Sequence, residues 1–153
     1  MGRKNRRRDY YVAPLGKASP PTCLRRDISG SGDVVPKRLE YWYAHIPVDF
    51  GTNIQGGDRP VLIVSNDEGN LNSGTVIVLP LTTHMKKLNL PCHVVVASPM
   101  KETDRSTVLV EQIVTLDKRQ LDRKLGDCPE EDARKIQAAL LDQLGLQPEQ
   151  RGL

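Results

Sequence analysis

Apolar residues in the middle of this chain fall into short runs, separated by stretches rich in glycine, proline and asparagine. Runs of about four to eight residues enriched in β-branched and aromatic side chains are typical of β-strands. We therefore predict five strands, over residues 41–43, 60–64, 75–82, 93–97 and 107–114. Glycines at positions 51, 56 and 57 predict a loop over residues 48–58, and the polar run at 66–70 predicts a turn.

After residue 128 the pattern changes to the spacing of an amphipathic helix. Apolar side chains recur on one stripe at Ala133, Ile136, Leu140 and Leu144. Pro129 fits the first helical position, acidic residues follow it at the positive end of the helix dipole, and Gly145 fits the end. A shorter helix is predicted over residues 118–125. Short strands followed by one amphipathic helix predict a mainly β domain with a C-terminal helix, built as a small, strongly bent sheet or barrel.

Charge divides the chain into unequal parts. Its 22 Lys and Arg against 19 Asp and Glu give a net charge of +3, but residues 1–37 hold nine basic and three acidic groups. Residues 38–153 are therefore net acidic. The first segment is also rich in glycine and proline and poor in periodic apolar positions, which is typical of a flexible segment. We predict a basic, flexible N-terminal extension over residues 1–37, a folded domain over 38–146 and a short tail over 147–153.

The cysteines and histidines predict neither disulfides nor a metal site. Cys23, Cys92 and Cys128 are odd in number and widely spaced, so a reducing cytosol is the expected compartment. The three histidines match no metal-ligand spacing. No run approaches the ~18 apolar residues of a transmembrane helix, and the basic N-terminal residues lead into no apolar segment of a signal peptide. We expect a cytoplasmic protein whose chemistry uses no metal or other cofactor.

Candidate chemistry lies where the predicted loop enters the strand at residues 60–64. Two glycines at 56 and 57 allow a tight turn or a close approach of the backbone to a ligand. Arg59 follows them, and a guanidinium can hold a phosphate and stabilise charge that develops in a transition state. Thr82, at the end of the next strand, carries a hydroxyl that can donate to a phosphate oxygen. An arginine in a surface ion pair and a threonine that only ends a strand are the alternatives.

The blocks around these residues resemble the MazF/PemK family of toxin endoribonucleases. They occur in the family's order over residues 38–146: RLEYWY at 38–43, GDRPVLI at 57–63, NDEGN at 66–70, TVIVLPLT at 75–82, LPCHV at 90–94 and LVEQIVTLDKR at 109–119. The resemblance implies a small SH3-like β-barrel of the MazF/PemK/CcdB type with a C-terminal helix. It also implies a homodimer that cuts single-stranded RNA at short sequences.

The reaction implied by this resemblance needs no metal. The ribose 2′-hydroxyl attacks the adjacent phosphorus, and the products carry a 2′,3′-cyclic phosphate and a 5′-hydroxyl. The family's catalytic arginine falls on Arg59, which would neutralise the phosphorane, and its catalytic threonine falls on Thr82, which would hold a phosphate oxygen. Cutting mRNA would inhibit translation and growth.

RNA recognition is expected from the loops that flank these two residues. The candidates for RNA binding are Asn53, Gln55, Thr83, Lys86, Lys87 and Gln112. Ile54 stands where many members have a glutamate, so an acid or base role at that position is lost or has moved. Glu111 is a candidate general base, although it could equally make a structural hydrogen bond.

The resemblance also implies partners. A cognate MazE-like antitoxin would lay a disordered acidic segment across the groove, and the complex would bind operator DNA through the antitoxin. The basic cluster within residues 1–37 would either strengthen RNA binding by phosphate contacts or serve as a solubilising tail. Two other functions fit the same fold: a CcdB-like gyrase poison and a non-catalytic regulator that binds nucleic acid.

Overall fold

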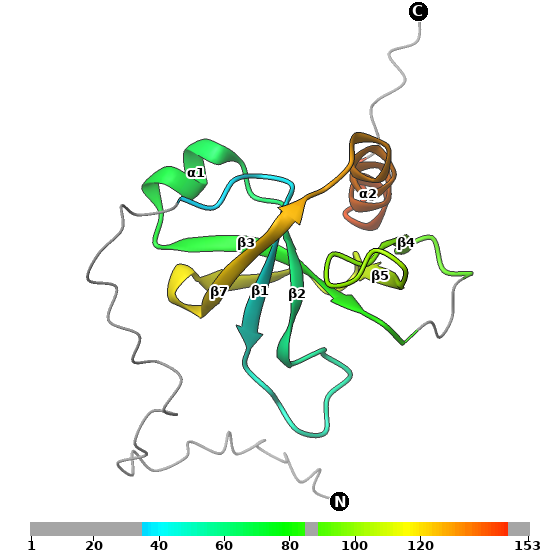
Figure 1. The fold of residues 1–153 in the computed structure, drawn as a ribbon, viewed down its shortest axis with the longest axis horizontal. Helices are drawn as coiled ribbons and strands as arrows, with labels where there is room; N and C mark the ends of the chain where they lie inside the picture. The colour runs from blue at the N-terminus through cyan, green and yellow to red at the C-terminus, as the bar shows by residue number, and fades with distance from the viewer. Residues whose placement is uncertain (1–34, 85–88, 147–153) are drawn as a thin grey trace, which may run out of the picture. The chain divides into compact units, whose positions relative to one another are not determined.

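The computed structural model describes residues 35–84 and 89–146 (Figure 1). The elements, in chain order, are β1 Glu40–Ile46, β2 Gly57–Ile63, α1 Asp67–Asn72, β3 Thr75–Thr82, β4 His93–Ala97, β5 Arg105–Leu109, β6 Val114–Asp117, the 3₁₀ turn η2 Lys118–Gln120, β7 Leu121–Asp127 and α2 Glu130–Gln143. The predicted N-terminal extension lies almost wholly outside the described residues, and so does the predicted tail at 147–153.

All strand pairs are antiparallel, and the strands follow one another across the sheet in the order β4-β5-β3-β2-β1-β7. β6 pairs with the first half of β3, which leaves the second half of β3 to β5. Within the described residues β4 and β7 do not pair, so the sheet is not closed into a complete ring. The predicted class, mainly β with a C-terminal helix, is confirmed.

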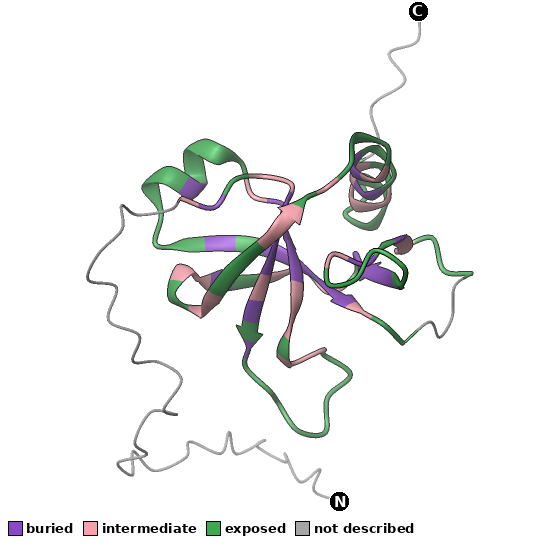
Figure 2. Cartoon of the chain, viewed as in Figure 1, coloured by how far each residue is buried: buried purple, intermediate pink, exposed green. Residues whose placement is uncertain are grey.

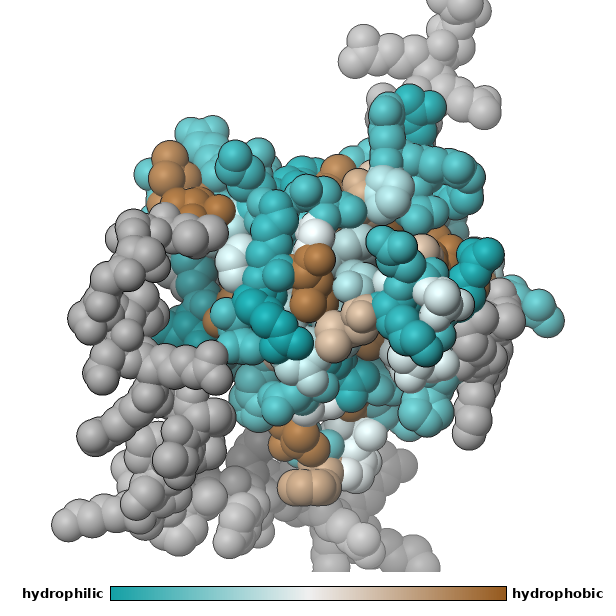
Figure 3. Space-filling model, viewed as in Figure 1, coloured by the Kyte–Doolittle hydropathy of each residue, from teal (hydrophilic) through white to brown (hydrophobic). Residues whose placement is uncertain are grey.

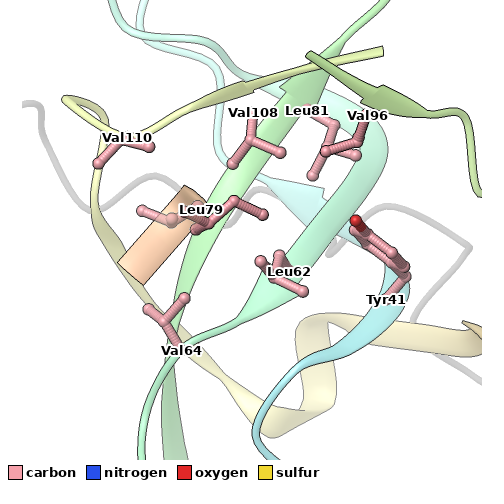
Figure 4. Close-up of a cluster of buried hydrophobic side chains, with 9 residues drawn as sticks. Tyr41, Leu62, Val64, Leu79, Leu81, Val96, Val108 and Val110 are labelled. Atoms are coloured by element: carbon pink, nitrogen blue, oxygen red, sulfur yellow. The ribbon is translucent and has the colours of Figure 1, made fainter. Parts of the chain in front are cut away.

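Alternate residues of the central strands serve two separate cores, one on each face. The first core, shown in Figure 4, contains Tyr41, Leu62, Val64, Leu79, Leu81, Val96, Val108, Val110 and Ile136. The second contains Trp42, Ala44, Ile46, Val61, Ile63, Val76, Val78 and Leu116. Successive side chains of a strand point to opposite faces, so β2 and β3 are buried on both sides, as Figure 2 shows at the centre of the sheet. This explains why both strands are continuous apolar runs in the sequence.

Helix α2 packs against the first core through Ile136, Ala139 and Leu140. Ala133 and Ile136 are buried, and Leu140 is partly buried against the same cluster. Leu144, the last residue of the predicted stripe, is 50% exposed, so the docked stripe is shorter than the sequence pattern indicates. Pro129 is the N-cap residue rather than the first helical residue. None of the helices in the described ranges is long and apolar enough to span a membrane.

Three predicted elements differ from the observed ones. Residues 107–114 are not one strand, because the chain leaves β5 at Leu109 and turns through 110–113 before β6 pairs with the other half of β3. The helix predicted at 118–125 is a single 3₁₀ turn followed by β7. There, pairing with β1 overrides the helical spacing. The polar run at 66–70 forms α1, because the Asn66 side chain caps its N-terminus by accepting the Gly69 N–H at 2.7 Å.

Candidate active site

Arg59 and Thr82 lie on neighbouring strands of the sheet, Arg59 within β2 and Thr82 at the end of β3. The pairing of β2 with β3 ends with Val61 opposite Pro80, and Thr82 itself pairs with Thr107 of β5. Because β2 and β3 are antiparallel, Arg59 near the start of β2 and Thr82 at the end of β3 lie toward the same end of the strand pair.

The loop between β1 and β2 folds back over Arg59. One guanidinium nitrogen, Nη1, donates to Gln55 Oε1 at 2.8 Å, and the other, Nη2, donates to the Gly56 carbonyl oxygen. The two glycines make this conformation possible. A β-carbon at Gly56 would lie 2.8 Å from Val48 Cα, and Gly57 has a φ of +89°, which favours glycine. The Gly-Gly pair thus brings the loop backbone onto the arginine.

Gln112 holds this loop from the turn between β5 and β6. Its Oε1 accepts the backbone N–H of Gln55 at 2.7 Å, and its Nε2 donates to the backbone carbonyl of Asn53 at 3.3 Å. Both ends of the Gln112 amide are therefore bonded to the loop backbone. A chain of hydrogen bonds links Gln112 through Gln55 to Arg59, so the predicted RNA-binding residues Gln55 and Gln112 are joined to the predicted catalytic arginine.

Partial burial sets the electrostatics of Arg59. Burial lowers the pKa of its guanidinium, and the nearby Tyr43 phenol acts in the opposite direction. Its Nε is buried and has no hydrogen-bond partner among the described residues. A buried donor without an acceptor costs free energy, about 1–3 kcal/mol. An acceptor such as a phosphate oxygen would remove that cost, but only after the loop has moved away from the side chain.

The Thr82 hydroxyl accepts the backbone N–H of His84 at 3.2 Å. This bond fixes the oxygen and uses one of its acceptor positions, and the hydroxyl hydrogen can still be donated. Thr83, which follows it, is exposed. Lys86 and Lys87 lie outside the described residues, so they stay predictions without a described position.

A small cleft of about 200 Å³ lies beside these residues. It is lined by Tyr43, Asp58, Pro60, Leu81, Thr82, Thr83, Ser98, Met100 and Ser106. Tyr43 and Pro60 are register partners, and Asp58 and Pro60 flank Arg59, so the alternation of β2 turns Arg59 to the opposite face. Thr82 lines this cleft and Arg59 does not.

Two features near the site were not predicted from the sequence. The first is a contact between His45 and Asp58, cross-strand partners on β1 and β2, whose Nδ1 and Oδ1 atoms lie 2.6 Å apart. Their pairing could not be found without the register. Glu111, the candidate general base, has its Oε1 2.9 Å from His93 Nε2. This is a hydrogen bond of the kind that the sequence allowed as the alternative to a catalytic role.

The second missed feature is an apolar tip on the loop between β1 and β2. Val48, Phe50 and Ile54 are exposed, and Phe50 is 91% exposed. Figure 3 shows hydrophobic atoms where this loop extends from a largely hydrophilic surface. The composition of the loop, with Phe50 as the sole phenylalanine of the chain, is the signal that could have drawn attention to it.

The mainly β fold with a C-terminal helix agrees with the fold class of the family that the sequence resembles. A family model described as "PemK-like, MazF-like toxin of type II toxin-antitoxin system" matches residues 37–144. The chain therefore belongs to this family, and the predicted membership is confirmed.

Individual relatives support the same assignment. Endoribonuclease EndoA of Bacillus subtilis (strain 168) is 37% identical over 114 residues, which cover 74% of this chain and 97% of that protein. A solved endoribonuclease in complex with its cognate antitoxin, from Mycobacterial species, is 30% identical with a TM-score of 0.56, covering 74% and 97% of the two chains. MazF from Deinococcus radiodurans, 23% identical with a TM-score of 0.63 over 74% and 99%, shares the fold. The predicted enzyme class agrees with the names of these relatives.

Proposed function

We propose that this protein is the toxin of a type II toxin–antitoxin system and that it acts as a sequence-specific endoribonuclease on single-stranded RNA. The single observation that carries the proposal is that Arg59, near the start of β2, and Thr82, at the end of β3, lie toward the same end of two antiparallel strands. One residue supplies a fixed positive charge and the other a hydroxyl donor. That pair is suited to a phosphodiester whose charge increases in the transition state.

In the proposed reaction the ribose 2′-oxygen attacks the adjacent phosphorus, and the bond from phosphorus to the 5′-oxygen breaks. The 2′-hydroxyl gives its proton to solvent water and the departing 5′-oxygen takes one from water, which gives a 2′,3′-cyclic phosphate and a 5′-hydroxyl. Arg59 neutralises the pentacovalent phosphorane, and Thr82 donates to a non-bridging oxygen. These roles need only groups of the chain itself.

The hydrogen bonds of Arg59 define what RNA must displace. Gln55 and the Gly56 carbonyl occupy the two terminal nitrogens, so the phosphate takes their place when the loop opens. Gln55, Asn53 and Gln112 then become available to bases, together with Thr83 and the two lysines at 86 and 87. Phe50 adds an exposed ring on which a base can stack, the usual support for single-stranded nucleic acid.

The proposal includes the partners of the family. A cognate MazE-like antitoxin covers the groove, the toxin forms a homodimer, and the complex binds operator DNA through the antitoxin. Support comes from the antitoxin complex of the 30% identical relative. The proposed compartment is the cytoplasm, where mRNA is the substrate and its loss stops translation and growth.

The test is cleavage of a long single-stranded RNA by the purified full-length protein in EDTA, with primer extension to map the ends. We expect discrete cuts that share a short sequence, and a rate at least ~10²-fold lower for Arg59→Ala. Arg119→Ala is the matched control, since that arginine is 81% exposed and paired with Asp117. Uncut RNA, or equal cutting by Arg59→Ala, would contradict the proposal. A gyrase poison or a non-catalytic regulator would likewise give no RNA products.

A further inference from the structure

Three metal-ligating side chains from two parts of the sequence meet at the edge of the sheet. Cys92 precedes β4, His93 begins it, and Glu111 follows β5. Their sulfur, nitrogen and oxygen ligand atoms all lie within 4.8 Å of one another. From this geometry we propose that Cys92, His93 and Glu111 form a binding site for Zn²⁺, separate from Arg59 and Thr82.

The spacing of the three atoms fits one ion. Ligand atoms bound tetrahedrally to zinc at ~2.0–2.3 Å lie roughly 3.3–3.8 Å apart. The His93 Nε2 to Glu111 Oε1 distance of 2.9 Å is shorter than this, and the 4.8 Å limit for the group is longer. Shifts of the ligand atoms by about an ångström, through side-chain rotation, would therefore bring all three to one ion, with a water as fourth ligand.

The backbone around the three residues is already fixed. The Cys92 carbonyl accepts the Val110 N–H at 2.9 Å, and the His93 N–H donates to the Leu90 carbonyl at 2.9 Å. His93 also pairs with Leu109 in the register of β4 and β5. The His93 side chain is 8% exposed and that of Glu111 is 29% exposed. His93 is therefore held by packing, and the group can be reached from solvent through Glu111. A metal site needs both the support and the entry path.

The donor set selects the ion. One thiolate, one imidazole and one carboxylate suit zinc, whereas Mg²⁺ and Ca²⁺ prefer oxygen ligands alone. Partial burial, and after it the nearby Glu111 carboxylate, raise the pKa of the Cys92 thiol. Binding therefore releases the thiol proton, and affinity rises with pH. Sequence spacing did not reveal the site because its third ligand, Glu111, comes from the turn after β5.

The test uses the full chain stripped with EDTA and then titrated with Co²⁺, which reports a bound thiolate by a sulfur-to-cobalt charge-transfer band. We expect the band in the native chain and in a Cys23→Ser, Cys128→Ser control, and its loss in Cys92→Ser. Zn²⁺ should abolish the band by displacement. His93→Gln and Glu111→Gln should each weaken Zn²⁺ binding at least ~10-fold in competition with a chromophoric chelator.

Circular dichroism of each variant separates ligand loss from unfolding. If His93→Gln fails to fold, Cys92→Ser and Glu111→Gln still decide the question, because both replace a ligand by a group of similar size. A native chain without the band, or a band that survives Cys92→Ser, would overturn the site. Neither readout involves RNA, so the result is independent of the proposed nuclease activity.

Discussion

The guanidinium of Arg59 donates to the side-chain oxygen of Gln55 at 2.8 Å, and the backbone N–H of the same glutamine donates to Gln112 at 2.7 Å. Gln55 therefore joins the arginine to a residue 57 positions further along the chain. In this conformation the loop occupies both terminal nitrogens of the guanidinium that we propose to bind the phosphate. The proposed function therefore requires the loop to open when RNA binds.

Gln112→Ala should release the loop. With Oε1 and Nε2 removed, the Gln55 N–H and the Asn53 carbonyl lose their partners, and amide hydrogen exchange at Gln55 should accelerate at least ~10-fold. Gln120→Ala is the matched control, because that glutamine also bonds two backbone groups, the Asp117 N–H and the His45 carbonyl. Unchanged exchange at Gln55 in Gln112→Ala would show that the loop stays closed without the Gln112 hydrogen bonds.

Thr82→Val should lower the rate of RNA cleavage with little effect on binding. The substitution keeps the shape of the side chain but removes the donor to the phosphate oxygen, which corresponds to a loss of roughly 10²-fold in kcat. Thr82→Ser keeps the hydroxyl and should retain most of the activity. Thr75→Val, at the exposed other end of β3, controls for changes in the strand. A loss confined to KM would instead assign Thr82 to binding.

Phe50→Ala should weaken binding to single-stranded RNA without altering stability. Stacking of one base on an aromatic ring is worth about 1–3 kcal/mol, or roughly 5- to 100-fold in Kd. Fluorescence anisotropy with a 2′-O-methyl RNA, which lacks the attacking hydroxyl, measures binding alone. Phe50→Trp should preserve it. Leu71→Ala, which removes an apolar side chain 64% exposed on α1, should have no effect. Equal affinity of Phe50→Ala and the native chain would exclude the ring from the RNA site.

Local patterns of the sequence predicted the bounds of β3 and β4, because each is a short run rich in β-branched residues between turn residues. The split between β5 and β6 and the strand at β7 could not be predicted, since both depend on which edge of β3 or β1 is free to pair. Pairing of distant segments decides those elements, and no local propensity records it.

The candidate site was likewise predicted only as far as local sequence allows. Arg59 and Thr82 were predicted because each stands in a recognisable block of its own strand. That both lie toward the same end of the sheet depends on the antiparallel pairing of β2 with β3. Gln112 was predicted to bind RNA, whereas in the structure both its amide groups bind the loop. The pairs of His45 with Asp58 and His93 with Glu111 arise from folding alone, so the sequence pattern contains no sign of them.

Glu40 should make stability depend on pH. Burial alone would raise the pKa of its carboxyl, but hydrogen bonds from Lys124, the Lys37 N–H and the Trp42 indole outweigh burial and lower the pKa below its ordinary value of 4.5. A carboxylate with a lowered pKa stabilises the fold above the pKa it has in the unfolded chain. That stability is lost as the pH falls through the folded-state pKa.

Urea unfolding of Glu40→Gln tests this relationship. We expect a loss of about 1–2 kcal/mol at pH 7, and a gap from the native chain that narrows at pH ~3 as Glu40 itself becomes protonated. Glu131→Gln is the control, since Glu131 also pairs with a lysine but on the exposed surface of α2. A gap that stays constant with pH would mean that the charge of Glu40 does not contribute.

Ile136→Ala and Leu144→Ala should differ in their effect on the free energy of unfolding, because only Ile136 is packed against the core. Both residues belong to one apolar stripe in the sequence, yet Ile136 is 1% exposed within the first core and Leu144 is 50% exposed. Truncating Ile136 leaves a cavity and should cost about 2–5 kcal/mol in urea unfolding, whereas Leu144→Ala should change the free energy by less than about 0.5 kcal/mol. A comparable loss in both variants would mean that the end of the helix is covered in solution. Only a neighbouring copy or another segment of the chain could then provide the missing contacts.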